Sequence, residues 1–146
     1  DAAIDIWRPD PDHMTEIADQ QVHQTPLADQ HRALGARMID FAGWLMPVQY
    51  SGILEEHRAV RERAGLFDLS HMGELEVSGP EAGAGLAAAL TNDATRLPVG
   101  RAQYSLICDP DGGVIDDLIV YRTGDEAFLV VPNAANAPIV AAKPGE

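Results

Sequence analysis

The sequence predicts an α+β fold, because segments with strand-like alternation and segments with helical spacing are interspersed along the chain. Three observations lead to this class. A β-hairpin is marked from Gln103 to Tyr121, an amphipathic helix follows Ser51, and the order from Glu74 to Val131 reads strand, helix, strand, strand, strand. A βαβ-type start followed by antiparallel hairpins and a closing helix is typical of a ferredoxin-like α+β sandwich, here cut before completion.

Composition narrows the functional classes. The 146 residues are 46% hydrophobic, enough for one ordinary core or parts of two small ones. A net charge of −13 with only 10 Lys and Arg residues argues against a nucleic-acid partner or an anionic membrane, since phosphate binding depends on clustered basic side chains. Cys108 is the single cysteine, and no apolar run approaches membrane-spanning length. We therefore expect a cytoplasmic protein, or one of an equivalent reducing compartment such as the mitochondrial matrix.

Residues 1–24 are polar, acidic and interrupted by prolines, and are expected to form an extension without regular structure. A helix is expected after Thr25, and Gly35 is placed to end it in the left-handed conformation. One face of this helix is formed by Leu27, His31 and Leu34. A short strand is expected over Met38–Phe41, and an apolar loop at Gly43–Pro47 breaks it.

The next helix is better marked. Ser51 can cap it, acidic residues lie near its positive end, and Gly65 can stop it. The stripe expected to be buried consists of Ile53, His57, Val60 and Ala64. A histidine on such a stripe is more often a hydrogen-bonded core or rim residue than a metal ligand or a base, and we interpret His57 in this way.

Alternation predicts a strand over Glu74–Ser78 with one solvent-facing side. A helix opened by Pro80 follows. Its expected buried positions are Ala82, Leu86, Ala89 and Leu90. After a further strand at Ala127–Val131, Asn133 can cap one more helical segment, which Pro138 is expected to interrupt.

The hairpin is the most strongly marked local feature. Tyr104–Cys108 and Val114–Tyr121 are rich in β-branched, aromatic and aliphatic residues. Asp109–Gly113 supplies the fixed φ, the side-chain capping and the positive φ that a chain reversal needs. Cys108, on the face of Tyr104 and Leu106, is expected to be a small buried hydrophobic residue rather than a nucleophile.

Strand alternation places Asp117 on the face of Ile115, Ile119 and Tyr121. A carboxylate among apolar side chains is costly unless its charge is used or it lies at a bulge or a rim. From this segment alone two interpretations stay open. Either Asp117 is a functional carboxylate, or a bulge turns both Asp116 and Asp117 into solvent.

Common motifs of catalysis and metal binding are absent from the sequence, including a Gly-rich phosphate loop, Cys or His pairs at metal spacing and a nucleophile elbow. The string Asp109–Gly112 resembles the start of a calcium loop. However, Val114 and Val120 occupy the sixth and twelfth positions, where such a loop requires Gly and a bidentate Glu. We therefore expect no metal.

Several strings in a fixed order carry a family resemblance. They are Thr25-Pro26-Leu27, Asp40–Trp44 with Met46-Pro47, Glu55–Arg61, Gly65–Gly73 (Gly-Leu-Phe-Asp-Leu-Ser-His-Met-Gly), Thr91–Asp93 and Gly112–Leu118 (Gly-Gly-Val-Ile-Asp-Asp-Leu). Any one string is weak evidence, but their joint order and spacing are specific. From about Thr25 to Asn136 the chain resembles the aminomethyltransferase of the glycine cleavage system, its T protein.

The resemblance implies an enzyme that transfers the methylene carbon from the aminomethyl-lipoyl arm of the H protein to tetrahydrofolate and releases ammonia. Tetrahydrofolate would be a co-substrate, the lipoylated H protein the partner, and no metal would take part. In that family the second Asp of the Ile-Asp-Asp-Leu string faces the reacting amine nitrogen of folate, a catalytic role that would fall to Asp117. By the same resemblance the folate pocket would be lined by Met72, Tyr104, Ile119, Tyr121 and Asn133.

The chains of this family are longer and have three domains, the first discontinuous in sequence. The resemblance implies that residues 25–70 begin an antiparallel-sheet first domain and that residues 71–146 form most of the second, so the chain is expected to be truncated and inactive alone. Residues that bind the pterin ring would lie in the absent part, and Pro132 is an extra residue before the Asn133–Asn136 string.

Two alternatives accompany the transferase. One is a truncated, non-catalytic fragment that binds folate or another protein. The other is a relative fused to a flavin-dependent demethylase, or serving tRNA-modification or iron-sulfur chemistry. The Ser-His-Met-Gly-Glu string at 70–74 and the Ile-Asp-Asp-Leu string at 115–118 favour the T protein over the relatives of this second kind.

Overall fold

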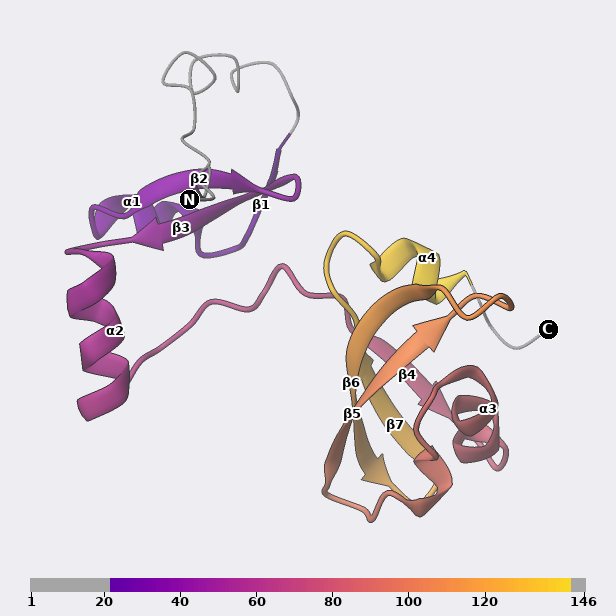
Figure 1. Cartoon of the computed structure of the whole chain (residues 1–146). Helices are drawn as coiled ribbons and strands as arrows, with labels where there is room; N and C mark the ends of the chain where they lie inside the picture. Colours follow the sequence, from indigo (N-terminus) through magenta and orange to yellow (C-terminus); the bar gives the residue numbers. More distant parts are fainter. Residues whose placement is uncertain (1–21, 143–146) are drawn as a thin grey trace, which may run out of the picture. The chain divides into compact units, whose positions relative to one another are not determined.

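The computed structural model describes residues 22–142, which form two compact units with the boundary between Asp68 and Leu69. Unit 1 comprises the described residues up to Asp68, and unit 2 those from Leu69 (Figure 1). Each unit combines helices with a small sheet, so the predicted α+β class is confirmed. Among the described residues, no helix has the length and apolar character needed to cross a membrane.

Unit 1 contains a three-stranded sheet and two helices. Its elements are β1 (His23–Gln24), α1 (Ala28–Ala33), β2 (Arg37–Phe41), β3 (Trp44–Gln49) and α2 (Ile53–Glu62). The strand order is β1-β3-β2, with β2 antiparallel and β1 parallel to β3. His23 and Gln24 thus belong to the sheet, although we expected an extension up to residue 24; residues 1–21 of that extension lie outside the described residues.

The predicted apolar loop at Gly43–Pro47 is wrong, because Trp44–Gln49 forms β3. Phe41 pairs with Trp44, which leaves Ala42 and Gly43 as a two-residue turn. Their φ angles are 51° and 83°, and the Gly43 N–H donates to Oδ1 of Asp40 over 2.8 Å. Two successive residues at positive φ match the twist of a hairpin, so this turn continues the sheet instead of ending it.

The helices of unit 1 differ from the sequence pattern. In α1 the buried residues are Ala28 and His31, whereas Leu27 and Leu34 are exposed. Gly35 follows at φ 77°, in the predicted left-handed conformation.

No residue of α2 is buried. The stripe predicted to be buried is wholly exposed at Ile53, His57, Val60 and Ala64, so the predicted burial of this face is wrong and His57 is not a core residue. The helix ends at Glu62, before Gly65, and Ser51 does not cap it. Glu56 accepts instead from the Tyr50 and Gly52 N–H groups. A helical face becomes buried only where another element covers it, and periodicity alone does not supply that element.

Unit 2 contains a four-stranded sheet. Its elements are β4 (Leu75–Ser78), α3 (Ala82–Ala89), the 3₁₀ turn η3 (Ala94–Arg96), β5 (Ala102–Cys108), β6 (Val114–Gly124), β7 (Ala127–Val131) and α4 (Ala137–Ala141). The strand order is β4-β7-β6-β5, and every neighbouring pair is antiparallel. The element order matches the prediction, but β4 and β5 lie at opposite edges, so β4-α3-β5 is not a parallel βαβ crossover.

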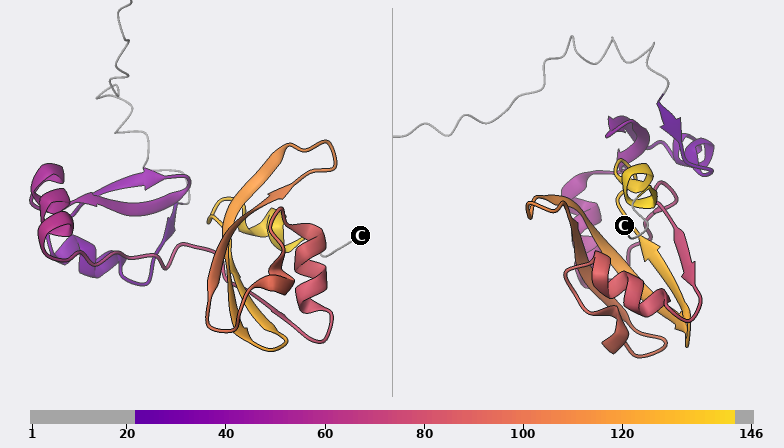
Figure 2. Two further views of the ribbon diagram at one scale, coloured as in Figure 1. Left: turned by 60° about the horizontal axis from the view of Figure 1, so that its bottom comes forward. Right: turned by 90° about the vertical axis from the view of Figure 1, so that its right-hand side faces the viewer.

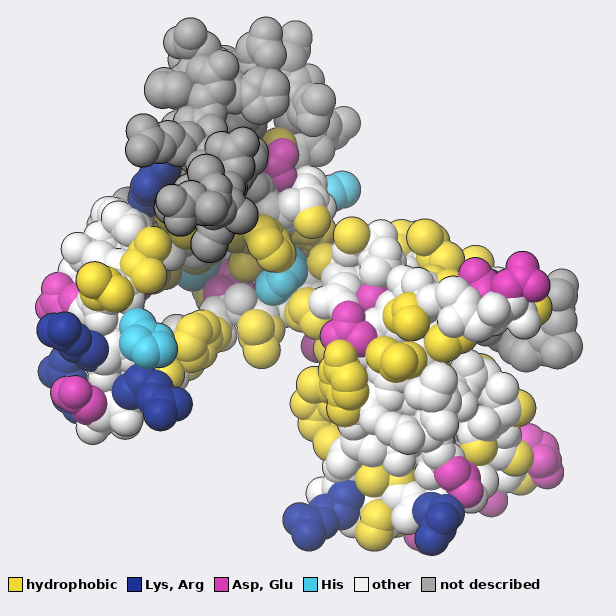
Figure 3. All heavy atoms as spheres, in the orientation of Figure 1, with side chains coloured by type: hydrophobic (Ala, Val, Ile, Leu, Met, Phe, Trp, Pro, Cys, Tyr) yellow, Lys and Arg dark blue, Asp and Glu magenta, His cyan; other side chains and the backbone are white. Residues whose placement is uncertain are grey.

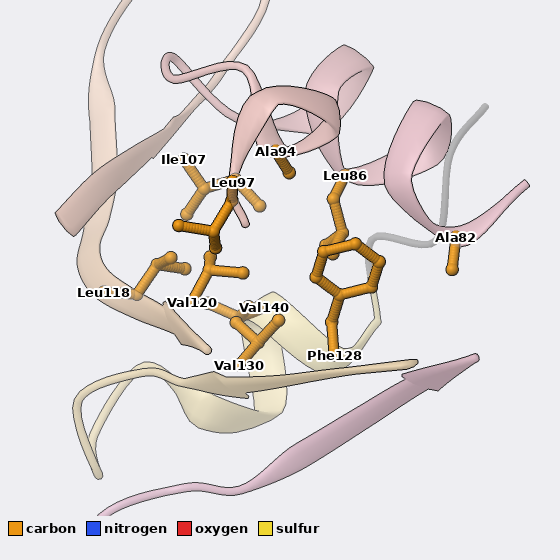
Figure 4. Packing of buried hydrophobic residues seen from close by; sticks show 10 residues of the cluster. All are labelled: Ala82, Leu86, Ala94, Leu97, Ile107, Leu118, Val120, Phe128, Val130 and Val140. Carbon is orange, nitrogen blue, oxygen red and sulfur yellow. The ribbon is translucent and has the colours of Figure 1, made fainter. Parts of the chain in front are cut away.

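The core of unit 2 lies between one face of the sheet and its helices (Figures 2 and 4). Its buried hydrophobic residues are Ala82, Leu86, Ala94, Leu97, Ile107, Leu118, Val120, Phe128, Val130 and Val140. The predicted burial of Ala82 and Leu86 is confirmed, whereas Ala89 and Leu90 are half-buried. Pro138 lies in the first turn of α4 and does not interrupt it.

The hairpin of β5 and β6 has the predicted turn. Oδ1 of Asp109 accepts from the Asp111 and Gly113 N–H groups over 3.0 and 2.7 Å, and Gly112 has φ 89°. A Cβ at Gly113 would lie 2.5 Å from the Asp109 carboxylate, so a larger residue there would displace the side chain that caps the turn. The turn therefore depends on side-chain capping by one aspartate.

Candidate functional site

The two faces of β6 carry different side chains. Asp116, Leu118 and Val120 are buried, whereas Asp117, Ile119 and Tyr121 are exposed. The predicted shared face of Asp117, Ile119 and Tyr121 is thus confirmed. Ile115 departs from it, because Cys108 pairs with Val114 and Ile107 with Asp116, which leaves Ile115 as the extra residue of a bulge, packed against the core.

Neighbouring strands extend the face of Asp117. Directly opposed residues point to the same side of a sheet, and the pairs are Tyr104 with Ile119, Leu106 with Asp117, Tyr121 with Leu129, and Ile119 with Val131. We call the surface formed by these seven residues the open face. In Figure 3, hydrophobic side chains gather over β5 and β6, where part of this face lies.

The Asp117 carboxylate is held on the open face by two neutral donors. The Tyr104 hydroxyl donates to its Oδ2 over 2.7 Å, and Nδ2 of Asn133 donates to its Oδ1 over 3.1 Å. The register explains both contacts. Tyr104 lies diagonally across from Asp117, within reach of an aromatic side chain, and the β6–β7 pairing continued past Val131 brings Asn133 opposite Asp117. Asp117 is therefore an exposed carboxylate whose two oxygens are anchored by hydrogen bonds.

The hydrogen bond to Asp117 raises the pKa of the Tyr104 phenol above its ordinary value, and desolvation and the charges of Asp117 and Asp116 act in the same direction. A phenolate could no longer donate to Asp117 and would repel it. Tyr104 therefore stays a hydrogen-bond donor throughout the neutral range.

Asp116 lies on the other face and is 3% exposed. Its Oδ2 accepts from the Asn133 N–H over 2.9 Å, and its Oδ1 accepts from Nδ2 of Asn133 over 2.9 Å and from Nδ2 of Asn136 over 2.7 Å. The alternative in which a bulge turns both aspartates into solvent is therefore wrong for Asp116.

Sequence reasoning missed Asp116 and Asn136 as members of this network. One signal was present, because Asp116 shares its alternation with the aliphatic Leu118 and Val120, a pattern that predicts burial. Asn133 was expected as a helix cap, but its side chain binds Asp116 and Asp117 instead.

The remaining predicted site residues lie close to this network. Ile119 is 37% and Tyr121 40% exposed on the open face. Met72 precedes Gly73, whose N–H donates to the Pro132 carbonyl over 3.2 Å, which places Met72 beside the segment that carries Asn133. Cys108 is a free thiol at the bulge and is half-buried rather than buried.

Unit 1 has a polar cluster of its own. His31 is buried, its Nδ1 lies 2.7 Å from the Tyr50 hydroxyl, and its Nε2 lies 2.8 Å from Oδ2 of Asp68. Burial, followed by the charges of Glu56 and Asp68, raises the pKa of Tyr50. Both ring nitrogens of His31 have partners, so this cluster ties α1, the end of β3 and the segment at Asp68 together.

Neither cluster is a metal centre. Across residues 22–142, no group of three or more His, Cys, Asp or Glu side chains is arranged to hold a metal ion. The chemistry available to the network around Asp117 is that of a carboxylate oriented by neutral donors. Such a group can accept a proton, orient an amine or stabilise a developing positive charge.

Comparison with known proteins gives consistent matches. Residues 27–143 match the family model described as the GCVT N-terminal domain. The chain is 56% identical over 123 residues to the aminomethyltransferase of Saccharopolyspora erythraea and 57% identical over 123 residues to that of Rubrobacter xylanophilus. Each alignment covers 84% of this chain, and it covers 34% and 33% of these relatives respectively.

A solved structure agrees with the sequence matches. The crystal structure of glycine cleavage system aminomethyltransferase T from Bartonella henselae superposes with a TM-score of 0.80 at 42% identity. The superposition covers 83% of this chain and 34% of the Bartonella henselae chain. This chain therefore spans about a third of the length of the relatives it matches. The chain therefore belongs to the GCVT N-terminal domain family, as its resemblance to the aminomethyltransferases predicted.

Proposed function

We propose that the open face of unit 2 binds tetrahydrofolate in an aminomethyltransferase of the glycine cleavage type, with Asp117 as the catalytic carboxylate. The observation that carries this proposal is the double anchoring of Asp117 by Tyr104 and Asn133 on an exposed aromatic and aliphatic face. The reaction would transfer the methylene carbon from the aminomethyl-lipoyl arm of H protein and release ammonia.

The anchoring suits this chemistry. Both donors to Asp117 are neutral, so they fix the direction of the carboxylate without cancelling its charge. Such a carboxylate can orient an amine nucleophile and stabilise the positive charge that develops as an iminium forms. Once a bound substrate excludes water from the open face, this interaction strengthens because the local dielectric falls.

The residues around Asp117 have distinct proposed tasks. Tyr104 and Tyr121 offer aromatic surface for a flat heterocycle, and Ile119 lies between the positions of Asp117 and Tyr121 on the same strand. Asn133 holds Asp117, and Met72 lines the end of the site near Pro132. We propose that units 1 and 2 correspond to segments of the first and second domains of the longer relatives, that lipoylated H protein is the partner, and that the reaction takes place in the cytoplasm.

A hybrid enzyme tests this function. Residues 27–143 would replace the matching segment of the Saccharopolyspora erythraea aminomethyltransferase, and methylene-tetrahydrofolate would be measured with aminomethyl-loaded H protein. Turnover near that of the parent enzyme is expected. A folded hybrid that binds tetrahydrofolate without turnover would instead support the non-catalytic folate-binding alternative, and one that does neither would contradict the assignment of the open face.

A further inference from the structure

We propose that Asp116, together with Asn136, is a positioning residue that holds the Asn133 amide in the orientation in which it donates to Asp117. This inference rests on the catalytic role proposed for Asp117. It assigns a task to a buried carboxylate that the proposed reaction does not use directly. The two aspartates are neighbours in sequence but lie on opposite faces of β6.

Neutral hydrogen-bond donors hold the Asp116 carboxylate in place. Three hydrogen bonds reach it, from the backbone and the side chain of Asn133 and from the side chain of Asn136. Asp116 is only 3% exposed. Burying a charged carboxylate is costly unless hydrogen bonds compensate for the water that the charge loses. The N–H groups of Asn133 and Asn136 therefore surround the Asp116 carboxylate. Removing this carboxylate would leave these donors without their acceptor.

The orientation of the Asn133 amide follows from its surroundings. Its Nδ2 lies 2.9 Å from Oδ1 of Asp116, 3.1 Å from Oδ1 of Asp117 and 3.0 Å from the Asp117 carbonyl. All three neighbours are acceptors, so a flipped amide would place its oxygen against three oxygens. Asp116 thus helps to select the orientation in which Asn133 offers its N–H group to Asp117.

The same arrangement separates two like charges. The amide nitrogen of Asn133 lies between the Asp116 and Asp117 carboxylates and donates to both. A shared neutral donor lowers the repulsion that adjacent carboxylates would otherwise feel. An amide at position 116 could not replace the carboxylate, because either of its orientations turns an NH2 group toward a donor of Asn133.

Asn136 connects this network to the core. It precedes α4, and its side chain donates to Oδ1 of Asp116 instead of capping the helix. Val140, on the same helix, belongs to the buried core of unit 2. A continuous set of contacts therefore runs from the core through α4, Asn136, Asp116 and Asn133 to Asp117.

The first arm of the test uses the chain itself and needs no activity. Hydrogen exchange of the Asn133 side-chain NH2 group would be measured by NMR in Asp116→Asn and in the charge-neutral variant Asn136→Ala. Loss of a hydrogen bond should speed this exchange by about tenfold. Two controls should leave it unchanged: Asp111→Asn, which makes the same charge change in the exposed turn, and Leu86→Ala, which weakens the core on α3.

The second arm uses the hybrid enzyme. Asp116→Asn and Asn136→Ala should lower kcat by about tenfold while KM for tetrahydrofolate changes little, because a misdirected Asp117 affects the reaction more than binding. If Asp116→Asn fails to fold, Asn136→Ala decides both arms. Unchanged exchange at Asn133, or faster exchange with unchanged kcat, would overturn the positioning role. An inactive unsubstituted hybrid would contradict the proposed function, while the exchange measurement would still decide whether Asp116 holds Asn133.

Discussion

The Tyr104 hydroxyl donates to Oδ2 of Asp117 over 2.7 Å from a diagonal position on the neighbouring strand. This contact joins an aromatic side chain and a carboxylate on the exposed side of the sheet. Together with the Asn133 amide, the phenol holds both oxygens of Asp117 and so fixes the direction of the carboxylate.

The titration of Tyr104 reports this contact. Its pKa lies above the ordinary value, first because of the hydrogen bond to Asp117, so Asp117→Asn should lower it. The stability that this shift contributes is fully present below the ordinary tyrosine pKa of about 10 and is lost as pH rises through the raised value. Ring-labelled tyrosine NMR would follow the change. The pKa of Tyr50, which is raised by burial and by the charges of Glu56 and Asp68, should not change in Asp117→Asn.

Leu118 and Ile119 test the assignment of the two faces of β6. Leu118 is 1% exposed and Ile119 37%. Leu118→Ala should therefore lower the free energy of unfolding by about 2–5 kcal/mol, and Ile119→Ala by much less. Urea denaturation followed by circular dichroism measures both. Equal losses would mean that the core does not lie on the Leu118 side.

Glu56 should make the start of α2 sensitive to acid. Hydrogen bonds from the Gly52 and Tyr50 N–H groups lower the pKa of Glu56. The stability it contributes is present above the pKa of the unfolded chain and is lost as pH falls through the lower, folded-state value. Hydrogen exchange of the Gly52 amide at decreasing pH should reveal this loss. Glu56→Ala should abolish the protection at every pH, whereas Glu55→Ala, in the same turn of α2, should retain it.

Ala42 is strained in the turn between β2 and β3. Its φ of 51° is the one positive φ among the described non-glycine residues. Ala42→Gly should raise the free energy of unfolding by about 1 kcal/mol, because glycine adopts this conformation without a Cβ clash. The matched change Ala59→Gly, in the interior of α2, should lower it by about 1 kcal/mol. A loss of stability in Ala42→Gly would show that the turn is not strained.

Much of unit 2 could be predicted from the sequence because its signals are local. Alternation marks β4, and Asp109 and Gly112 specify the turn of the hairpin through side-chain capping and positive φ. The same alternation correctly placed Asp117 with Ile119 and Tyr121. It failed at Ile115, because a bulge adds a residue that a strict period of two cannot reveal.

The errors in unit 1 have a different cause. Burial of α2 depends on which element covers it, and the sequence pattern gives only its amphipathic character. The sequence predicts a loop at Gly43–Pro47, whereas Trp44–Gln49 forms β3. The two-residue turn that allows this depends on positive φ at Ala42, which a non-glycine residue does not signal. The role of Asn133 depends on the register of β6 with β7, which brings together residues far apart in sequence.

Turnover of the Asp117→Asn hybrid enzyme tests the central claim most directly. The variant preserves the shape of the side chain and removes its charge, so kcat should fall by about 100-fold or more while tetrahydrofolate binding is largely kept. Asp111→Asn, with the same charge change in the exposed turn, should retain full turnover. Turnover of Asp117→Asn equal to that of the unsubstituted hybrid would contradict the claim that Asp117 is the catalytic carboxylate.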